Sequence, residues 1–138
     1  MGKTWSDAMG ALAPFIGFCG IRRTHRENGV GRSEVDVAPE LRNGADAAHG
    51  GLIMTLLDSV MASAARSTLA DDHGVLTVDM NVAFLAPGRG KLLGEGRVVR
   101  GGRSLIFCEG SVRDEAGQLV ARASGVFSAR RPRAQVTA

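Results

Sequence analysis

The chain has 138 residues and a formal net charge of +3, with 44% hydrophobic and 22% charged residues. These values fit one globular domain and exclude a multidomain protein, a disordered chain and a coiled coil. With no tyrosine and one tryptophan, the sequence offers almost no aromatic surface on which nucleic-acid bases could stack. A small ligand that carries phosphate therefore suits the mildly basic balance better than nucleic acid does.

The cysteines and histidines show no pattern of a metal site or a disulfide framework. Cys19 and Cys108 are too few for a stapled secreted scaffold, and we expect buried, reduced thiols. His25, His49 and His73 are widely spaced, so we assign no metal site. The start of the chain lacks an apolar signal core, and no apolar run approaches the roughly 17 residues of a membrane helix. We expect a cytoplasmic protein without a membrane partner.

The first half of the chain predicts helix, hairpin and helix. Apolar spacing predicts a short helix over residues 5–15. Strands are predicted over residues 16–25 and 31–37, joined by a tight turn at Asn28-Gly29. A long helix begins near His49, and residues 52–69 contain no glycine or proline. Because this helix is apolar almost all round, we expect it to be buried.

The second half predicts four strands in succession. Residues 76–84 alternate, with apolar residues on one face and Thr77, Asp79 and Asn81 on the other. Strands over residues 92–100, 104–113 and 119–127 follow, and residues 130–133 are expected to be a frayed basic tail. The order predicts an α+β fold in which an antiparallel sheet wraps one buried helix. The free face of the sheet is then expected to become a subunit interface.

The start of the long helix offers backbone chemistry at His49-Gly50-Gly51. Glycine lets a ligand approach the backbone closely, and the helix dipole points its positive end outward there. An electronegative oxygen would be stabilised at this point. The same glycines could instead let the helix pack closely against a strand, and the pair alone leaves both interpretations open.

Asp58 is the first charged residue of the long helix and lies about two and a half turns after His49. It is either a solvated residue on a thin polar stripe with Thr55, Ser59 and Ser63, or a general base or nucleophile in an apolar setting.

Three polar residues of the strand that follows allow two interpretations. Thr77, Asp79 and Asn81 could hold a water or a carbonyl oxygen if their face lines a cleft, or could simply meet solvent. Asn43 stands before Gly44 in an ordinary turn pair that needs no ligand.

Taken together, these residues resemble a known family. Asn43-Gly44, His49-Gly50-Gly51, Asp58 on the helix, and a strand from Thr77 that ends in Phe84-Leu85-Ala86-Pro87-Gly88 are similar in order and spacing to the hotdog-fold acyl-CoA thioesterases of the phenylacetate-pathway type. The resemblance runs from about residue 16 to residue 129. It implies a single hotdog thioesterase domain over residues 1–138, and it favours the catalytic interpretation of Asp58.

The resemblance further implies an active site shared between two subunits. The residue matching Asp58 attacks the thioester carbonyl or activates the hydrolytic water, and the hydroxyl matching Thr77 in the same subunit orients that water. The other subunit supplies the N–H matching Gly50 as oxyanion donor, with the residues matching Asn43 and His49 beside it. The family often has serine where Thr77 stands, so the hydroxyl is kept while the extra methyl narrows the space.

The resemblance implies an acyl-CoA substrate with a small aromatic or medium-chain acyl group. No cofactor is expected, because coenzyme A is part of the substrate. A homo-oligomer is implied, at least a dimer and commonly a tetramer. Basic residues near turns could contact the coenzyme A phosphates; Arg103 is the first candidate, and the others are Arg89, Lys91, Arg97 and Arg100.

Two alternative functions are considered for the same fold. A hotdog dehydratase would need a proline-bearing motif with histidine and an acidic residue, which is absent. A non-catalytic acyl-CoA-binding module would keep the fold and the phosphate contacts, and an assay of thiol release would distinguish it.

Overall fold

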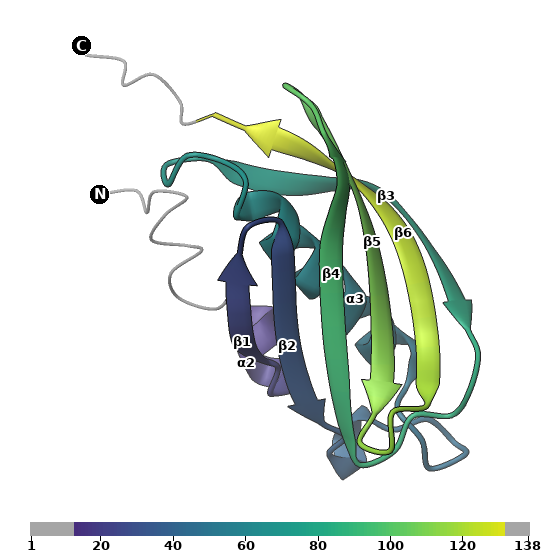
Figure 1. The fold of residues 1–138 in the computed structure, drawn as a ribbon. Coiled ribbons are helices and arrows are strands. Elements are labelled where there is room, and N and C mark those ends of the chain that lie inside the picture. The colour runs from purple at the N-terminus through teal and green to yellow at the C-terminus, as the bar shows by residue number, and fades with distance from the viewer. Residues whose placement is uncertain (1–12, 132–138) are drawn as a thin grey trace.

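The computed structural model describes residues 13–131, in which a six-stranded antiparallel sheet wraps around one long helix (Figure 1). The helical elements are α2 (Pro14–Cys19), the 3-10 turn η1 (Pro39–Leu41) and α3 (Gly50–Arg66). The strands are β1 (Arg22–Glu27), β2 (Val30–Asp36), β3 (Gly74–Phe84), β4 (Lys91–Gly101), β5 (Leu105–Asp114) and β6 (Leu119–Arg130). Their order across the sheet is β1-β2-β4-β5-β6-β3. The predicted α+β architecture is therefore confirmed.

The beginning of the chain differs from the prediction. Residues 16–19 belong to helix α2 and not to the strand predicted over residues 16–25. Pro14 lies in the first turn of α2, where its missing N–H is not needed, and Gly20 closes the helix with a φ of 74°. The turn at Asn28-Gly29 joins β1 to β2 as predicted, with φ values of 51° and 75°. Most of the helix predicted over residues 5–15, and residues 132–133 of the expected tail, lie outside the described residues.

Helix α3 begins at the predicted place and ends early. It runs to Arg66, whereas the stretch without glycine or proline continues to residue 69. The hydroxyls of Ser67 and Thr68 donate to the carbonyls of Ala64 and Ala65, at 2.7 and 2.8 Å. Such side-chain hydrogen bonds compete with the backbone hydrogen bonds of the helix. The helix therefore ends at Arg66, and a loop leads into β3.

One side of α3 packs closely against the sheet. A methyl group on Gly31 of β2 would lie 2.5 Å from the carbonyl oxygen of Val60, so only glycine fits there. The prediction that the helix is buried all round is wrong along one stripe, because Gly51 and Met54 are exposed and Asp58 is half-buried. That stripe keeps the polar residues of α3 accessible.

Strand β3 contains a bulge that the alternating sequence conceals. The residues on either side of Val78 pair with consecutive residues of β6, which leaves Val78 as an extra residue. A bulge shifts the alternation by one position. Thr77 therefore faces α3, whereas Asp79 and Asn81 line hollows on the opposite side of the sheet. The prediction that Thr77, Asp79 and Asn81 share one face is wrong for this reason.

Three further features concern membranes, metals and thiols. Within residues 13–131 no helix is long and apolar enough to span a bilayer. The same residues hold no cluster of three side chains that could bind a metal ion.

Cys19 and Cys108 are free and buried, as predicted, and burial raises the pKa of Cys108 to about 12.

Candidate active site

The start of α3 leaves one backbone donor unpaired. His49 caps the helix: its Nδ1 accepts the N–H of Gly51 at 2.9 Å, and its carbonyl accepts the N–H groups of Leu52 and Ile53. Among the described residues, no acceptor lies within hydrogen-bonding range of the N–H of Gly50. Because the first turn of a helix carries partial positive charge, this N–H can donate to an electronegative oxygen.

The same cap determines where His49 carries its proton. Since Nδ1 accepts a hydrogen bond, the neutral ring holds its proton on Nε2. His49 is exposed, so this second N–H is available to a ligand at the helix start. A proton on Nδ1 would remove the acceptor and break the cap.

A groove of about 480 Å³ opens beside Gly50. Its wall is mostly apolar and comes from α3, the end of β3 and the loop that follows, including Ile53, Phe84, Leu85 and Ala86. A methyl group on Gly50 would lie 3.5 Å from the ring of Phe84, so this ring covers the helix start. Asn43 and Arg89 also line the groove and give it polar character.

Asn43 shapes the loop at this groove. Its Oδ1 accepts the N–H groups of Ala45 and Ala47, at 2.9 and 3.2 Å. Arg89 donates to the carbonyl of Ala45 at 3.3 Å and so joins the same loop to the segment before β4. Oδ1 of Asn43 therefore stabilises the turn, as the turn interpretation predicts. The Nδ2 of Asn43 is the group that could bind a ligand.

A second group of polar atoms lies further along α3. The hydroxyl of Thr77 donates to Oδ1 of Asp58 at 2.6 Å, a short bond of the charge-assisted kind. Among the described residues Oδ2 of Asp58 has no hydrogen-bond partner. A water could donate to that oxygen or to Thr77 Oγ1, because a hydroxyl that donates one bond can still accept.

The two groups are too far apart to act on one bond within one chain. Gly50 and Asp58 lie eight residues apart on the same helix, which corresponds to about 12 Å along its axis. Asn43, Gly50 and Arg89 thus form one half-site, and Asp58 and Thr77 form another.

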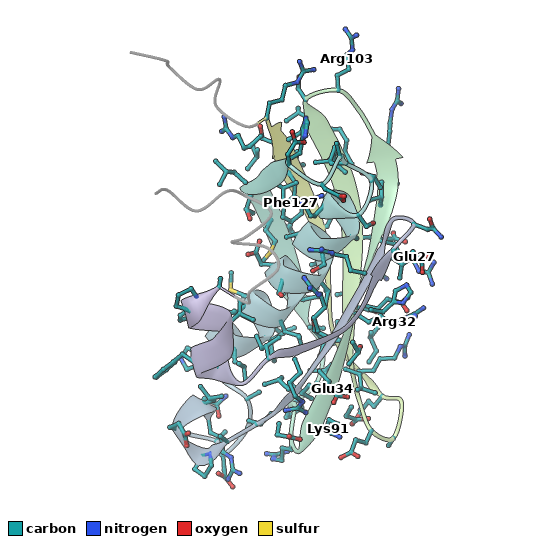
Figure 2. All side chains as sticks on the ribbon, turned by 90° about the vertical axis from the view of Figure 1, so that its left-hand side faces the viewer. Glu27, Arg32, Glu34, Lys91, Arg103 and Phe127 are labelled. Atoms are coloured by element: carbon teal, nitrogen blue, oxygen red, sulfur yellow. The ribbon has the colours of Figure 1, made fainter. Side chains whose placement is uncertain are left out.

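Within one chain Arg103 does not line the groove beside Gly50. Figure 2 shows Arg103 at one end of the molecule and Lys91, the first residue of β4, toward the other. Arg89 lies two residues before Lys91 and lines the groove. Within one chain Arg89 therefore lies beside Gly50, whereas Arg103 does not. Arg97 lies on the far side of the sheet, where it pairs with Glu95.

The alternating pattern of residues 76–84 did not predict that the ring of Phe84 lies against Gly50. The sequence signal for this contact was Pro87-Gly88, which ends the strand that carries Phe84. The carbonyl of Gly88 accepts the N–H of Ala48 at 2.7 Å, and this bond joins the loop after β3 to the start of α3. Phe84 is thereby brought against Gly50.

Comparisons with known proteins identify the family of the chain. The family model described as the thioesterase superfamily matches residues 46–121, a range that includes Gly50, Asp58 and Thr77. Human acyl-coenzyme A thioesterase 13 is 33% identical over 95 residues, which cover 64% of this chain and 65% of that protein.

Two solved structures are also similar. A protein of Streptococcus mutans UA159 bound to acetyl CoA is 27% identical with a TM-score of 0.75, and the match covers 83% of this chain and 91% of that one. A phenylacetic acid degradation-related protein from Ralstonia eutropha JMP134 is 25% identical with a TM-score of 0.80, covering 89% and 95%.

Proposed function

Since the chain belongs to the thioesterase superfamily and is a thioester hydrolase, we propose that it cleaves acyl-CoA with a small aromatic or medium-chain acyl group. Water is the second substrate, and the products are the free acid and coenzyme A, so no cofactor is consumed. The apolar wall of the groove, with Arg89 beside it, supports a substrate that joins an apolar chain to a phosphate-bearing end. The acetyl CoA bound to the Streptococcus mutans relative supports the same substrate class.

We assign the chemical roles by half-site. The thioester oxygen accepts the N–H of Gly50, where the positive end of α3 stabilises the charge that develops on it. Asp58 provides the attacking oxygen, either its own or that of a water that it deprotonates. Thr77 holds the carboxylate and orients the water, and Nε2 of His49 and Nδ2 of Asn43 bind the substrate beside Gly50.

The observation that carries this proposal is the separation of about 12 Å between Gly50 and Asp58 on one helix. A thioester carbonyl cannot lie within hydrogen-bonding distance of both in one chain. In the proposed mechanism a second copy of the chain supplies the missing half.

The edge of the sheet offers a way to join the two halves. β3 is an edge strand, and it runs antiparallel to α3, with Phe84 near Gly50 and Thr77 near Asp58. If two β3 edges pair antiparallel about a two-fold axis near Met80 and Asn81, the Phe84 end of one strand lies beside the Thr77 end of the other. Each Gly50 then approaches the second copy's Asp58, and the dimer has two complete sites.

Subunit mixing tests this proposal. Asp58→Ala removes one half-site, and Gly50→Pro removes the N–H of the other while leaving Asn43 to shape its loop. Random exchange makes half of the dimers mixed, and each has one rebuilt site of two, so roughly a quarter of wild-type activity should return. Release of free thiol from a panel of acyl-CoA thioesters measures it. No recovery despite exchange proven by mass spectrometry would contradict a shared site, and wild-type protein that binds acyl-CoA without releasing thiol would contradict hydrolysis.

A further inference from the structure

The exposed stripe of α3 carries one large apolar side chain, Met54, between the two half-sites. Because successive helical residues are rotated by about 100°, Gly50, Met54 and Asp58 lie within about 80° of one another around the helix. Met54 is equally far from the other two, about 6 Å along the helix axis from each. Its side chain is 41% exposed, whereas the neighbouring Leu57 is fully buried. A single chain thus leaves an apolar side chain in water between its backbone donor and its carboxylate.

The proposed dimer, on which this inference rests, brings two Met54 side chains together. The rotation that places Gly50 beside the second copy's Asp58 also places Asp58 beside the second copy's Gly50. Met54 is midway between them on the same face of α3, so it comes to lie against the second copy's Met54. The axis passes β3 near Met80, whose side chain packs against the core. Met54 is therefore the side chain of the exposed stripe that lies at the two-fold axis.

The polar end of the groove decides which way the acyl group points. Asn43 and Arg89 lie on the loop side of Gly50, where the phosphate-bearing end of the substrate is proposed to bind. In a thioester the acyl group and the sulfur lie on opposite sides of the carbonyl carbon, so the acyl group extends away from these loops and along α3. The next exposed side chain of α3 in that direction is Met54. A second acyl group, bound at the other site of the dimer, approaches the same two methionines from the opposite side.

We propose that the two Met54 side chains of a dimer meet at its two-fold axis, close the inner end of both acyl pockets, and thereby set the longest acyl group that is hydrolysed rapidly. The substrate class is an acyl-CoA whose acyl group ends before the axis, such as a single aromatic ring or a chain of at most medium length. Methionine is unbranched and flexible, so a longer chain displaces it only at a cost in rate. Met54 acts here on specificity and takes no part in the chemistry at Gly50 or Asp58.

Two substitutions of opposite size test this role in the full-length protein. Met54→Ala should open the space between the two pockets, and Met54→Phe should shorten each pocket. Thiol release gives kcat/KM for a straight-chain series from acetyl-CoA to palmitoyl-CoA. The ratio of kcat/KM for lauroyl-CoA to that for butyryl-CoA should rise roughly tenfold or more in the alanine variant and fall roughly tenfold or more in the phenylalanine variant, because each changes the pocket by several methylene-sized groups.

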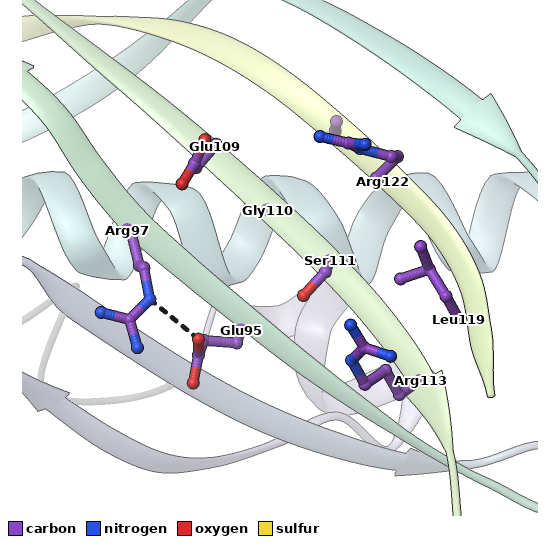
Figure 3. Close-up of a pocket in the computed structure, with 9 residues that line it drawn as sticks. Glu95, Arg97, Glu109, Gly110, Ser111, Arg113, Leu119 and Arg122 are labelled. Carbon is purple, nitrogen blue, oxygen red and sulfur yellow. Dashed lines mark hydrogen bonds and ion pairs between the residues drawn. The ribbon is translucent and has the colours of Figure 1, made fainter. Parts of the chain in front are cut away.

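Leu119→Ala is the matched control. Leu119 lines a charged hollow on the face of the sheet that turns away from α3, and Figure 3 shows its side chain in front of the strands with α3 behind them. The substitution shortens an apolar side chain on the side of the sheet away from both half-sites. The lauroyl-to-butyryl ratio should therefore stay within about twofold of the wild-type value. Circular dichroism checks the fold of every variant.

Met54→Cys tests the position at the axis without reference to activity. A short bismaleimide adds the S–H of one thiol across each of its two double bonds, so it should join two copies of this variant into a covalent dimer. Wild-type protein should not be cross-linked, because Cys19 and Cys108 are buried. A denaturing gel measures the fraction joined.

The role of Met54 is overturned if both size variants keep the wild-type chain-length profile, if both lower kcat/KM for every substrate to the same extent, or if the cysteine variant is not cross-linked. Failure of the proposed function looks different. Wild-type protein that releases no thiol from any member of the series contradicts hydrolysis itself, whereas an active wild type with unchanged profiles in both size variants contradicts only the role of Met54.

Discussion

At the start of α3 the functional group is a backbone N–H, that of Gly50, whereas about two turns further on it is a pair of side chains, Asp58 and Thr77. The helix and the cap made by His49 position the backbone donor, so ordinary side-chain substitutions leave it in place. The pair can be altered one functional group at a time. Substitutions in the two half-sites should therefore lower activity for different physical reasons.

The largest effect is expected in the side-chain half. Asp58→Asn keeps the shape of the side chain but removes the negative charge that attacks or takes a proton, so kcat should fall roughly 10²-fold or more. Thiol release with acyl-CoA measures the fall, and circular dichroism verifies the fold. Unchanged turnover in a folded variant would falsify the catalytic role.

Gly50→Pro tests the backbone half. Proline is accepted at the first position of a helix, and His49 already has the extended conformation that proline requires before it, with φ −58° and ψ 139°. The variant should keep α3 and lose only the N–H, lowering kcat by about 10²-fold.

Gly50→Ala is the matched control for that substitution. It adds a methyl group at an ordinary contact distance from Phe84 and keeps the N–H, so most activity should remain. Equal losses in the alanine and proline variants would show that the space beside Phe84 matters and that the donor does not.

Thr77→Val removes one hydroxyl from the side-chain half. Valine is nearly isosteric and favours strands, so the fold should be kept or slightly stabilised. If the hydroxyl holds Asp58 and orients the water, kcat should fall roughly tenfold with little change in KM. Thr77→Ser keeps the hydroxyl and should keep activity. Equal kcat values in wild type and both variants would exclude the orienting role.

The smallest effect should separate capping from substrate binding at His49. His49→Ala loses the bond to the N–H of Gly51 and should cost about 1 kcal/mol of unfolding free energy. His49→Asn supplies a good capping side chain and should recover most of that stability. If activity follows stability through the two variants, His49 acts as a cap; if activity stays low in the asparagine variant, its Nε2 contacts the substrate.

The difference between the two halves also explains what could be predicted. The start of α3 was found from the glycines after His49 and the apolar run that follows, and the Asn28-Gly29 turn from its dipeptide. In each case the preferred backbone angles of a few adjacent residues decide the outcome. The prediction of a strand from residue 16 was wrong because a short helix begins at Pro14 and is capped by Gly20. The apolar residues of this helix also suit a strand.

By itself, the sequence determined the order of helix and strands and the residue types at the helix start, because these depend on local conformation and on which side chains avoid water. Only the tertiary structure decided that Thr77 faces Asp58. Strict alternation would put Thr77 on one face with Asp79, and the bulge at Val78 forms only where β3 pairs with β6. The contact of Phe84 with Gly50 likewise depends on the bond between Ala48 and Gly88, which joins residues distant in the chain. Such contacts follow from packing and register over the whole sheet, and no local pattern encodes them.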